Sequence, residues 1–538
     1  MFSSTVLVVG SGPVGLWLAL ELRRSNVDVL VIDTKLSMND RSIHSKALTL
    51  SAGTLATFDS RGLASSFLAE ALPMTRAHFG ALETLLELNE NVLGVRHAYN
   101  LAIPQAQTEK ILLRHCLNAG VRFEWGLKFL GLAKNGSDGV VASAGRLSAD
   151  GSLTNETIDL YSQWLVGCDG THSTVRAAAN IAFEGVPSEV TGVLADAKFT
   201  NLPPPDASGG WIIRRGPKGS GMIIRLGDGV HHRFVGLFTD AKHRKASEDI
   251  SLDDIKSHLS STFGSDLGVH SPLWLSRYGS ACRMASPFGK GRVFLAGDAA
   301  HQMLPAGGKA TQEENAGRKT VAQPRSEDYR AEKITEASER VIRLLDTYTT
   351  ERHAAVKDVI DNVLAQMALL VADKPHENAI RSVFSETLKF PDLNGLWARR
   401  VTGFGEPTAP FHLEGQGDET LIGTRLTHMR VGKSGDDLFN TMSLDHFVLL
   451  LRQDSADDEK KYHNCLQKGI VGWSKRVTVL VSPTYSTSEV WNEVMAVLVR
   501  PDGRIAWVGR TKSGTEIMID SLRQVLQRWF GEEQRADK

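Results

Sequence analysis

Three glycines near the N-terminus have the residue type and spacing of a phosphate-binding turn. Gly10, Gly12 and Gly15 directly follow an apolar run, TVLVV, whose β-branched content is typical of a buried parallel strand. In such a turn the first glycine permits a tight bend, the second lets the backbone approach a pyrophosphate, and the third lets a helix pack closely on the strand. The spacing therefore predicts a dinucleotide-binding turn; the alternative is a glycine-rich turn in another kind of α/β protein.

The elements around these glycines fit the same interpretation. Residues 16–23 (LWLALELR) have the apolar content of a helix, and residues 27–32 read as a second strand that ends before Asp33. The helix N-terminus would present N–H groups to phosphates, and Asp33 would accept hydrogen bonds from a ribose. This strand–turn–helix–strand unit does not by itself distinguish FAD from NAD.

The composition is that of an ordinary globular protein with several domains. The chain has 538 residues, of which 42% are hydrophobic, and a formal net charge of -1; single cores stop growing near about 250–300 residues. The charge gives no reason to expect nucleic acid as a partner, and no apolar stretch approaches the roughly 18 residues of a membrane span. The four cysteines are far apart and lack metal-ligand spacing, so we expect no metal, reduced thiols and a cytoplasmic protein.

Two further strand ends carry an acid beside a glycine. In the segment WLVGCDGTHSTVR, a short apolar strand leads to Asp169 and Gly170, and a Ser/Thr-capped helix follows. In the segment GRVFLAGDAAH, another short strand leads to Gly297 and Asp298. Taken alone, Asp169 is best explained as a turn acid that caps a helix.

In this order and spacing, the three segments resemble the fingerprints of the class A FAD-dependent aromatic hydroxylases, which include the phenol 2-monooxygenase-like flavoproteins. The resemblance implies that FAD is the cofactor, that Asp298 holds its ribityl chain and that Pro305 lies against the flavin ring. Ser173 and Arg176 also match the second fingerprint. The cofactor contacts that the resemblance implies are Gly10, Gly12, Gly15, Asp33, Arg41, Lys46, Gln105, Asp169, Gly170, Gly297, Asp298, Pro305 and Gly308.

The segment between the second and third fingerprints differs in character. It contains short alternating pieces, GGWIIRRG, GMIIRLG and HHRFVGLF, which predict a mostly antiparallel sheet. By the resemblance, this sheet is the substrate domain that covers the flavin. No catalytic residue can be named, and each pocket candidate is as well explained as ordinary sheet surface or core. The candidates are Trp211, Arg214, Arg225, His232 and Phe234, with Arg283 a weaker one.

The pattern departs from the family after Gly308. Residues 309–330 are charged throughout and lack an apolar stripe, and Pro324 would break a helix there. In the family, a short loop and a helix pointing at the flavin follow this position. Three explanations remain open: a divergent loop that still serves the flavin, a foreign segment that leaves the protein weak or inactive, or wider variation within the family.

The C-terminal third predicts a separate domain. Short buried strands (HFVLLL, VTVLVS and AVLVR) and a final helix resemble the thioredoxin-like domain of phenol-hydroxylase-type members. Cys465 is the single cysteine of this part, so dithiol exchange is excluded and a packing or dimerisation role is expected.

The expected fold class is therefore α/β, with a GR2-type Rossmann-like FAD-binding domain, an interleaved antiparallel-sheet substrate domain and a thioredoxin-like C-terminal domain. The expected boundaries are 1–78, 105–185 and 283–370 for the FAD-binding domain, 79–104 and 186–282 for the substrate domain, 371–415 for a helical linker, and 416–538 for the C-terminal domain.

The resemblance implies an FAD-dependent monooxygenase that uses NADPH or NADH and O2 to hydroxylate a phenolic or polyketide-type aromatic substrate in secondary metabolism. No second GxGxxG follows, so the nicotinamide co-substrate is expected to bind transiently. A homodimer is expected as well. The alternatives are a Baeyer–Villiger or epoxidising monooxygenase on the same fold, and a flavin-deficient, non-catalytic relative.

Overall fold

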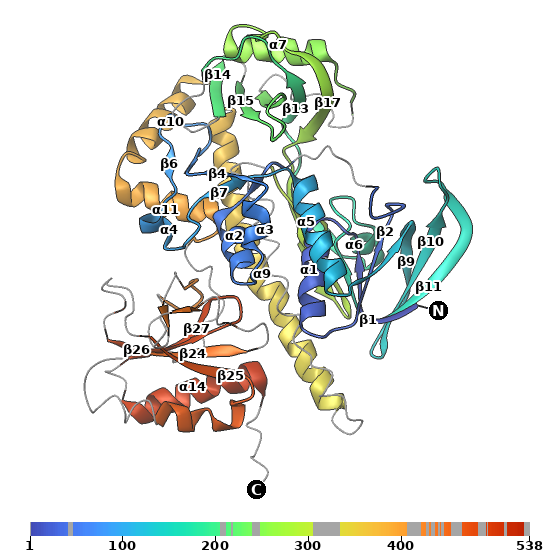
Figure 1. Ribbon diagram of the computed structural model, residues 1–538, viewed down its shortest axis with the longest axis vertical. Helices are drawn as coiled ribbons and strands as arrows, with labels where there is room; N and C mark the ends of the chain where they lie inside the picture. Colours follow the sequence, from blue (N-terminus) through green and yellow to red (C-terminus); the bar gives the residue numbers. More distant parts are fainter. Residues whose placement is uncertain are drawn as a thin grey trace.

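The computed structural model can be followed along the chain in Figure 1. It describes residues 2–40, 47–204, 211–216, 219–238, 248–304 and 334–405 (side chains from 348 in the last range), and in the C-terminal domain 421–426, 430–431, 436–438, 442, 446–452, 465–482, 491, 493–510 and 514–531.

An eight-stranded sheet forms the core of the first domain. Its neighbours from β20 to β8 are all parallel, in the order β20-β11-β1-β2-β8, and β19 is antiparallel at the edge beside β20. The predicted antiparallel meander is present as β9, β10 and the long β11. The strands are β1 (Phe2–Val9), β2 (Val29–Asp33), β8 (Arg122–Trp125), β9 (Leu127–Gly136), β10 (Gly139–Leu147), β11 (Leu153–Gly167), β19 (Gly289–Lys290) and β20 (Val293–Leu295).

The helices α1 (Pro13–Arg24) and α5 (Gln105–Asn118) lie side by side against this sheet (Figure 1). Val6, Leu7 and Val8 of β1 are fully buried, which explains why this strand is continuously apolar rather than alternating. Shorter helices, α2 (Ala52–Asp59), α3 (Ala64–Leu68) and α6 (Thr174–Ala178), complete this part.

The second large sheet is antiparallel throughout, as its alternating sequence predicts. Its order is β14-β15-β16-β13-β17, and α7 (Leu252–Phe263) covers its outer face at the top of Figure 1. The strands are β13 (Thr191–Lys198), β14 (Trp211–Gly216), β15 (Gly219–Arg225), β16 (His232–Phe238) and β17 (His270–Gly279).

Short strands connect the two large sheets. Residues 79–104, which the sequence assigns to the substrate domain, contribute strands that pair outside the five-stranded sheet: β7 with β3 and β4, and β6 with β5. A third small sheet has the order β12-β18-β21. The bounds are β3 (Thr49–Leu50), β4 (Leu72–Met74), β5 (Arg76–Ala77), β6 (Leu86–Glu87), α4 (Glu90–Leu93), β7 (Asn100–Ala102), β12 (Ala182–Val186), β18 (Cys282–Ser286), the 3-10 turn η1 (Gly297–Ala299) and β21 (His301–Gln302).

Three helices follow the third fingerprint. The long helix α9 (Ile334–Leu370) contacts β18 and β19, and α10 (Pro375–Thr387) and α11 (Pro391–Thr402) pack on residues 77–98 through a shared apolar cluster. The helical prediction for the start of 371–415 therefore agrees with the structure. None of the helices in the described part of the chain is both long and apolar enough to cross a membrane.

The C-terminal domain has a four-stranded sheet of order β25-β24-β26-β27. The pair β24–β25 is parallel and the other two pairs are antiparallel, and α14 covers one face. The thioredoxin-like interpretation stays a prediction with which this order is consistent. The bounds are β22 (Arg430–Val431), β23 (Asp436–Asp437), β24 (Phe447–Arg452), η5 (Val471–Trp473), β25 (Val477–Ser482), β26 (Val494–Val499), β27 (Ile505–Arg510) and α14 (Thr515–Phe530).

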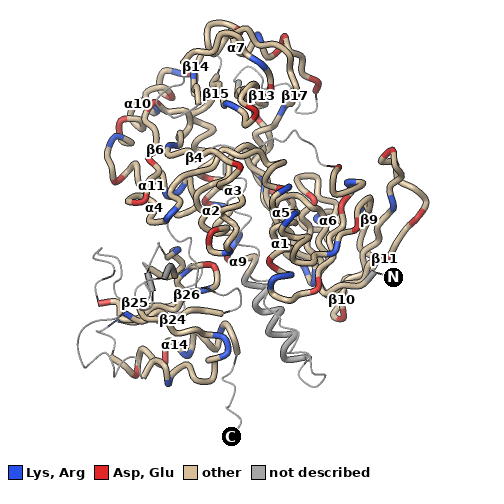
Figure 2. The backbone as a smooth tube through the Cα atoms, in the orientation of Figure 1, with Lys and Arg blue, Asp and Glu red and all other residues tan. Residues whose placement is uncertain are grey.

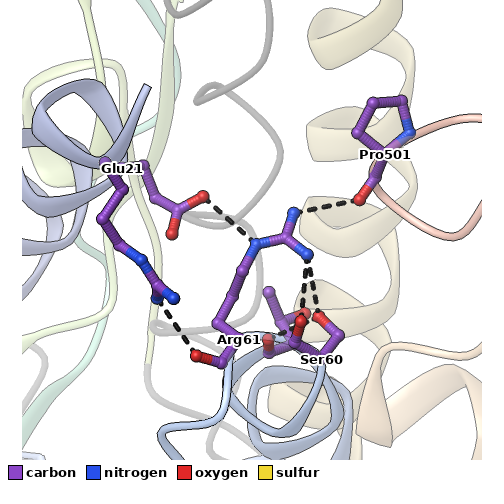
Figure 3. Close-up of polar contacts among 6 residues, drawn as sticks. Glu21, Ser60, Arg61 and Pro501 are labelled. Atoms are coloured by element: carbon purple, nitrogen blue, oxygen red, sulfur yellow. Dashed lines mark hydrogen bonds and ion pairs between the residues drawn. The ribbon is translucent and has the colours of Figure 1, made fainter. Parts of the chain in front are cut away.

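Buried arginines connect the C-terminal domain to the first domain. Arg61 Nε lies 3.3 Å from Glu21 Oε2 inside the first domain, and Arg61 Nη2 donates to the Pro501 carbonyl oxygen at 2.9 Å (Figure 3). Arg425 Nη1 donates in the opposite direction, to the Gly53 carbonyl oxygen at 3.1 Å. Acidic and basic residues are interspersed along the first domain, the region of the five-stranded sheet and the C-terminal domain, in agreement with the near-zero net charge (Figure 2).

Candidate cofactor and substrate site

The three fingerprints meet at one edge of the parallel sheet. Because β20, β11, β1 and β2 are parallel neighbours, their carboxyl ends lie together, which is where ligands bind in open α/β sheets. Hydrogen bonds continue past the strand ends: Gly10 N–H donates to Ile32 O at 2.9 Å, Cys168 N–H to Val9 O at 2.8 Å, and Ala296 N–H to Gly167 O at 2.9 Å.

The glycines of the first turn differ in what surrounds them. A Cβ at Gly10, whose φ is 103°, would lie 2.4 Å from the Cys168 carbonyl oxygen, and one at Gly15 would lie 1.9 Å from the Gly10 carbonyl oxygen. A Cβ at Gly12 would meet nothing within 4 Å. Gly10 and Gly15 are therefore required by close packing. Gly12 caps α1 beside open space, as the approach of a pyrophosphate requires.

Asp33 is held as a charged acceptor at the end of β2. It accepts the N–H of Ser11 at 2.5 Å and the N–H of Lys35 at 2.9 Å, and the Lys35 ammonium lies 3.5 Å away. Burial would raise the pKa of Asp33, but the Lys35 charge and these N–H groups outweigh it and hold the pKa below its ordinary value. The carboxylate is therefore ionised and suited to accept further hydrogen bonds from a ribose.

In the second fingerprint, the Asp169 carboxylate is hydrogen-bonded within the protein. Asp169 Oδ1 accepts the Ser173 hydroxyl at 2.6 Å, and Oδ2 accepts the Val175 N–H at 3.1 Å, so the side chain caps α6. This is the helix-capping role that the sequence offered as the alternative. Gly170 has φ 79° and no atom within 4 Å of a built Cβ, which leaves room beside it for a ligand.

Arg176 links the second fingerprint to the third. Its Nη2 donates to Thr171 O and its Nη1 to Ala299 O, both at 2.9 Å. Asp298 is exposed in η1, with Thr171 Oγ1 3.4 Å from its Oδ2. A Cβ at Gly297, whose φ is 61°, would lie 2.6 Å from Val14 Cγ2, so the turn that carries Asp298 packs directly on the start of α1.

Gln105 lies at the start of α5 and is connected to Asp33. Its N–H donates to Ala47 O, and its Nε2 donates to Glu109 Oε1, each at 3.0 Å. Glu109 Oε2 is 4.0 Å from Lys35 Nζ, which also pairs with Asp33. Glu109, which the sequence analysis missed, completes this network. The expected contacts Arg41, Lys46, Pro305 and Gly308 lie outside the described residues.

Most of the pocket candidates lie on the outer face of the five-stranded sheet. Phe234 is 0% exposed in the cluster beneath α7, and His232, two residues earlier, shares its face. The register pairs Arg225 with His232 and so places Arg225 on this face as well. Arg214 is exposed and alternates with Trp211, which points to the opposite, inner face.

The inner face contacts the first domain. Trp211 packs in one cluster with Met74 and Ile224, beside Ala102 of β7 and Leu48, which directly precedes β3. A second cluster joins inner-face leucines to the end of the third fingerprint and to α9; its members include Leu194, Leu237, Leu304 and Val363. The inner face therefore lies against the segment that leads to Pro305.

The inner face also carries a buried ion pair that the sequence analysis missed. Arg233 Nε and Nη2 bind Asp196 Oδ1 and Oδ2 at 2.6 and 2.7 Å, and the two residues are only 2% and 4% exposed. The guanidinium carbon lies 5.2 Å from the ring of Trp274. No local signal in the sequence identifies this pair, because it depends on the register of β13 and β16, in which Asp196 and Arg233 are direct cross-strand partners.

Comparisons with known proteins agree with this arrangement. The FAD binding domain family model matches residues 3–363, and the model of the aromatic-ring hydroxylase C-terminal domain matches residues 419–533. The chain is 32% identical to a rifampicin monooxygenase of Streptomyces venezuelae, over 98% of both chains. It is 30% identical to the 12-dehydrotetracycline 5-monooxygenase/anhydrotetracycline 6-monooxygenase of Streptomyces rimosus, again over 98% of both chains.

Solved structures of similar proteins share the whole fold. The anhydrotetracycline hydroxylase from Streptomyces rimosus superposes with a TM-score of 0.80 at 28% identity, over 99% of this chain and 100% of the other. An aromatic hydroxylase from angucycline biosynthesis superposes with a TM-score of 0.78 at 29% identity, over the same shares. The resemblance seen in the three fingerprints is therefore confirmed, and the chain belongs to the FAD-dependent aromatic-ring hydroxylase family of monooxygenases.

Proposed function

We propose that this monooxygenase hydroxylates a fused-ring phenolic substrate of the polyketide type, with O2 and NADPH or NADH as co-substrates. One observation carries the proposal: the apolar and aromatic inner face of the five-stranded sheet lies against the end of the third fingerprint. The rifampicin and tetracycline names of full-length relatives support this substrate class.

The strand-end residues fit FAD, and we assign them roles on that basis. The open space at Gly12 and the N-terminus of α1 suit the pyrophosphate, and the ionised Asp33 suits the adenosine ribose. The space at Gly170 and the exposed Asp298 suit the ribityl chain. When bound, FAD supplies the activation of O2 after reduction by the nicotinamide. The proposed contacts outside the described residues remain Arg41, Lys46, Pro305 and Gly308.

The chain's own contribution to the reaction is to position the aromatic ring and exclude water. Trp211, Met74 and Ile224 form a largely buried apolar surface that suits the face of a fused-ring substrate. We propose that Phe234 and His232 support this surface from the outer side of the sheet. The domain boundaries given above, the thioredoxin-like C-terminal domain and a homodimer remain part of this proposal.

Turnover experiments test the proposal. Purified protein with added FAD should oxidise NADPH or NADH faster when rifampicin, anhydrotetracycline or 1-naphthol is present, and labelled O2 should place one oxygen atom on the ring. Insertion of that oxygen into a ring C–C bond, giving a lactone, would instead support the Baeyer–Villiger alternative. A flavin-loaded protein that no aromatic compound stimulates would contradict the proposed substrate class.

A further inference from the structure

His78 lies beside Trp211, whose side chain is on the inner face of the five-stranded sheet. The His78 ring is 5.8 Å from the Trp211 ring, at an interplanar angle of 75°, and Trp211 Nε1 donates to Met74 Sδ at 3.2 Å. His78 follows β5 directly and is half-buried. It therefore belongs to the surface proposed above to receive the aromatic ring.

The turn that follows His78 is built to fix its position. Gly80 and Ala81 have φ values of 56° and 50°, a left-handed conformation that a non-glycine residue adopts only at a cost. Arg381 of α10 donates to both of their carbonyl oxygens, at 2.9 Å from Nη1 and 2.6 Å from Nη2. Gln366 of α9 accepts the Gly80 N–H at 3.3 Å. Two helices therefore hold the turn through its backbone.

Side-chain packing also fixes the position of this turn. Phe79 is buried between Phe384 and Trp397, with ring centroids at 5.3 and 4.9 Å. A Cβ at Gly80 would lie 2.8 Å from Leu369 Cβ, so the turn is in close contact with the end of α9. Phe79 thus anchors the loop in the helical cluster, while the preceding side chain, His78, contacts the substrate sheet.

Arg381, which holds the turn after His78, carries a buried charge, and burying a charge is unfavourable for folding. The described hydrogen bonds of Arg381 all go to main-chain carbonyl oxygens, those of Gly80, Ala81 and Leu369. Desolvation lowers the pKa of this guanidinium to about 10. Burying an arginine to hold one short turn indicates that the position of the residue before that turn matters.

The hydrogen bonding of His78 fixes which nitrogen carries its proton. The Ala81 N–H donates to His78 Nδ1 at 3.4 Å, so the neutral ring carries its proton on Nε2. Desolvation lowers the pKa of His78 to about 4, which keeps the imidazole neutral at physiological pH. His78 can therefore act as a neutral hydrogen-bond donor beside an aromatic surface.

We propose that His78 contacts the substrate directly: its Nε2–H donates a hydrogen bond to an oxygen of the aromatic substrate, and Trp211 packs against the ring system. Arg381 and Gln366 are positioning residues that hold the imidazole. This assignment rests on the proposed function and deepens it, because it names the group that recognises an oxygenated aromatic rather than a hydrocarbon.

The test compares two ligands of similar shape, 1-naphthol and 1-methylnaphthalene, on the FAD-loaded protein. Binding is measured by the change in flavin absorbance. His78→Phe should weaken 1-naphthol binding about 2- to 10-fold more than 1-methylnaphthalene binding, the value of one neutral hydrogen bond. His78→Gln keeps a hydrogen-bond donor and should therefore retain part of the preference for 1-naphthol that His78→Phe loses. His270→Phe, at an exposed histidine of β17, is the matched control and should change neither affinity.

Several results would overturn the assignment. Equal losses for the two ligands in His78→Phe, or wild-type protein that binds both equally or neither, would exclude the hydrogen bond. Arg381→Lys should reduce the 1-naphthol preference with FAD content and thermal midpoint retained; an unchanged preference would limit Arg381 to a structural role. Failure of the proposed function would look different: no aromatic compound, anhydrotetracycline included, would stimulate NADPH or NADH oxidation by the wild-type protein.

Discussion

A side chain added at Gly12 should weaken FAD binding without destabilising the apoprotein, whereas a side chain added at Gly15 should destabilise the fold. Gly12 has φ -68° and ψ -177°, which any residue adopts, and no atom lies within 4 Å of a built Cβ. We expect Gly12→Val to change the free energy of unfolding of the apoprotein by no more than about 1 kcal/mol. Its side chain would occupy the space assigned to the pyrophosphate, so FAD affinity should fall at least about 100-fold, or about 2.8 kcal/mol.

Gly15→Ala should instead damage the fold. Alanine favours a helix by up to about 1 kcal/mol over glycine, but its Cβ would lie 1.9 Å from the Gly10 carbonyl oxygen, a backbone atom that cannot rotate away. Relief of this contact requires a shift of α1 against β1, and overpacking of this kind costs about 1–3 kcal/mol or more. We expect a net loss of about 1–2 kcal/mol in the apoprotein.

Thermal unfolding with and without excess FAD separates the two effects. Gly12→Val should keep the wild-type midpoint without FAD and lose the increase that FAD produces, because ligand binding to the folded state alone raises the midpoint. Gly15→Ala should have a lowered midpoint even without FAD. A Gly12→Val protein that retains stoichiometric FAD would refute the placement of the pyrophosphate, and an unaltered midpoint for Gly15→Ala would refute the packing argument.

Three further predictions concern single charged groups. Asp298→Ala should lower FAD affinity by about 10- to 100-fold, because it removes the charge-assisted hydrogen bond that we propose Asp298 makes to the ribityl chain. Unchanged flavin occupancy after gel filtration would contradict this proposed role. Arg61→Met removes the cation that pairs with the buried Glu21 carboxylate, so the free energy of unfolding in urea should fall by about 3–5 kcal/mol. Glu21→Gln in the Arg61→Met background should recover part of this loss. A urea midpoint of Arg61→Met equal to that of the wild type would show that the ion pair contributes nothing to stability. Because the folded pKa of Asp33 is lowered, its contribution to stability is present above the unfolded-state pKa of about 3.9 and is lost as pH falls through the folded pKa; Asp33→Asn should therefore flatten the acid limb of the stability–pH profile, and an identical acid limb would show that the network around Asp33 does not hold its charge.

The parts of the site that the sequence predicted are those with local signals. The turn at Gly10, Gly12 and Gly15 combines strand, bend and helix within a few residues, so its geometry follows from residue types at fixed spacing. The two later fingerprints are also local strand–turn segments. Their meeting at one sheet edge follows from the parallel pairing of β20, β11 and β1, which the family resemblance supplied rather than the pattern itself.

The parts that could not be predicted depend on contacts between distant residues. The five-stranded sheet is buried on both faces, so alternation alone did not show that Phe234 lies beneath α7 while Trp211 faces the first domain. The Asp196–Arg233 pair requires the register between β13 and β16. The position of the turn after His78 depends on Arg381, which is about 300 positions away in the sequence and has no local motif.

The most direct test of the account is the visible absorbance of freshly purified protein before and after addition of FAD, followed on the same sample by NADPH and NADH oxidation. We expect flavin bands at close to one FAD per chain and nicotinamide oxidation that a phenolic fused-ring compound accelerates. Protein that stays colourless after incubation with FAD would contradict the account. It would favour the alternative in which residues 309–330, which lie outside the described residues, have cost the protein its cofactor.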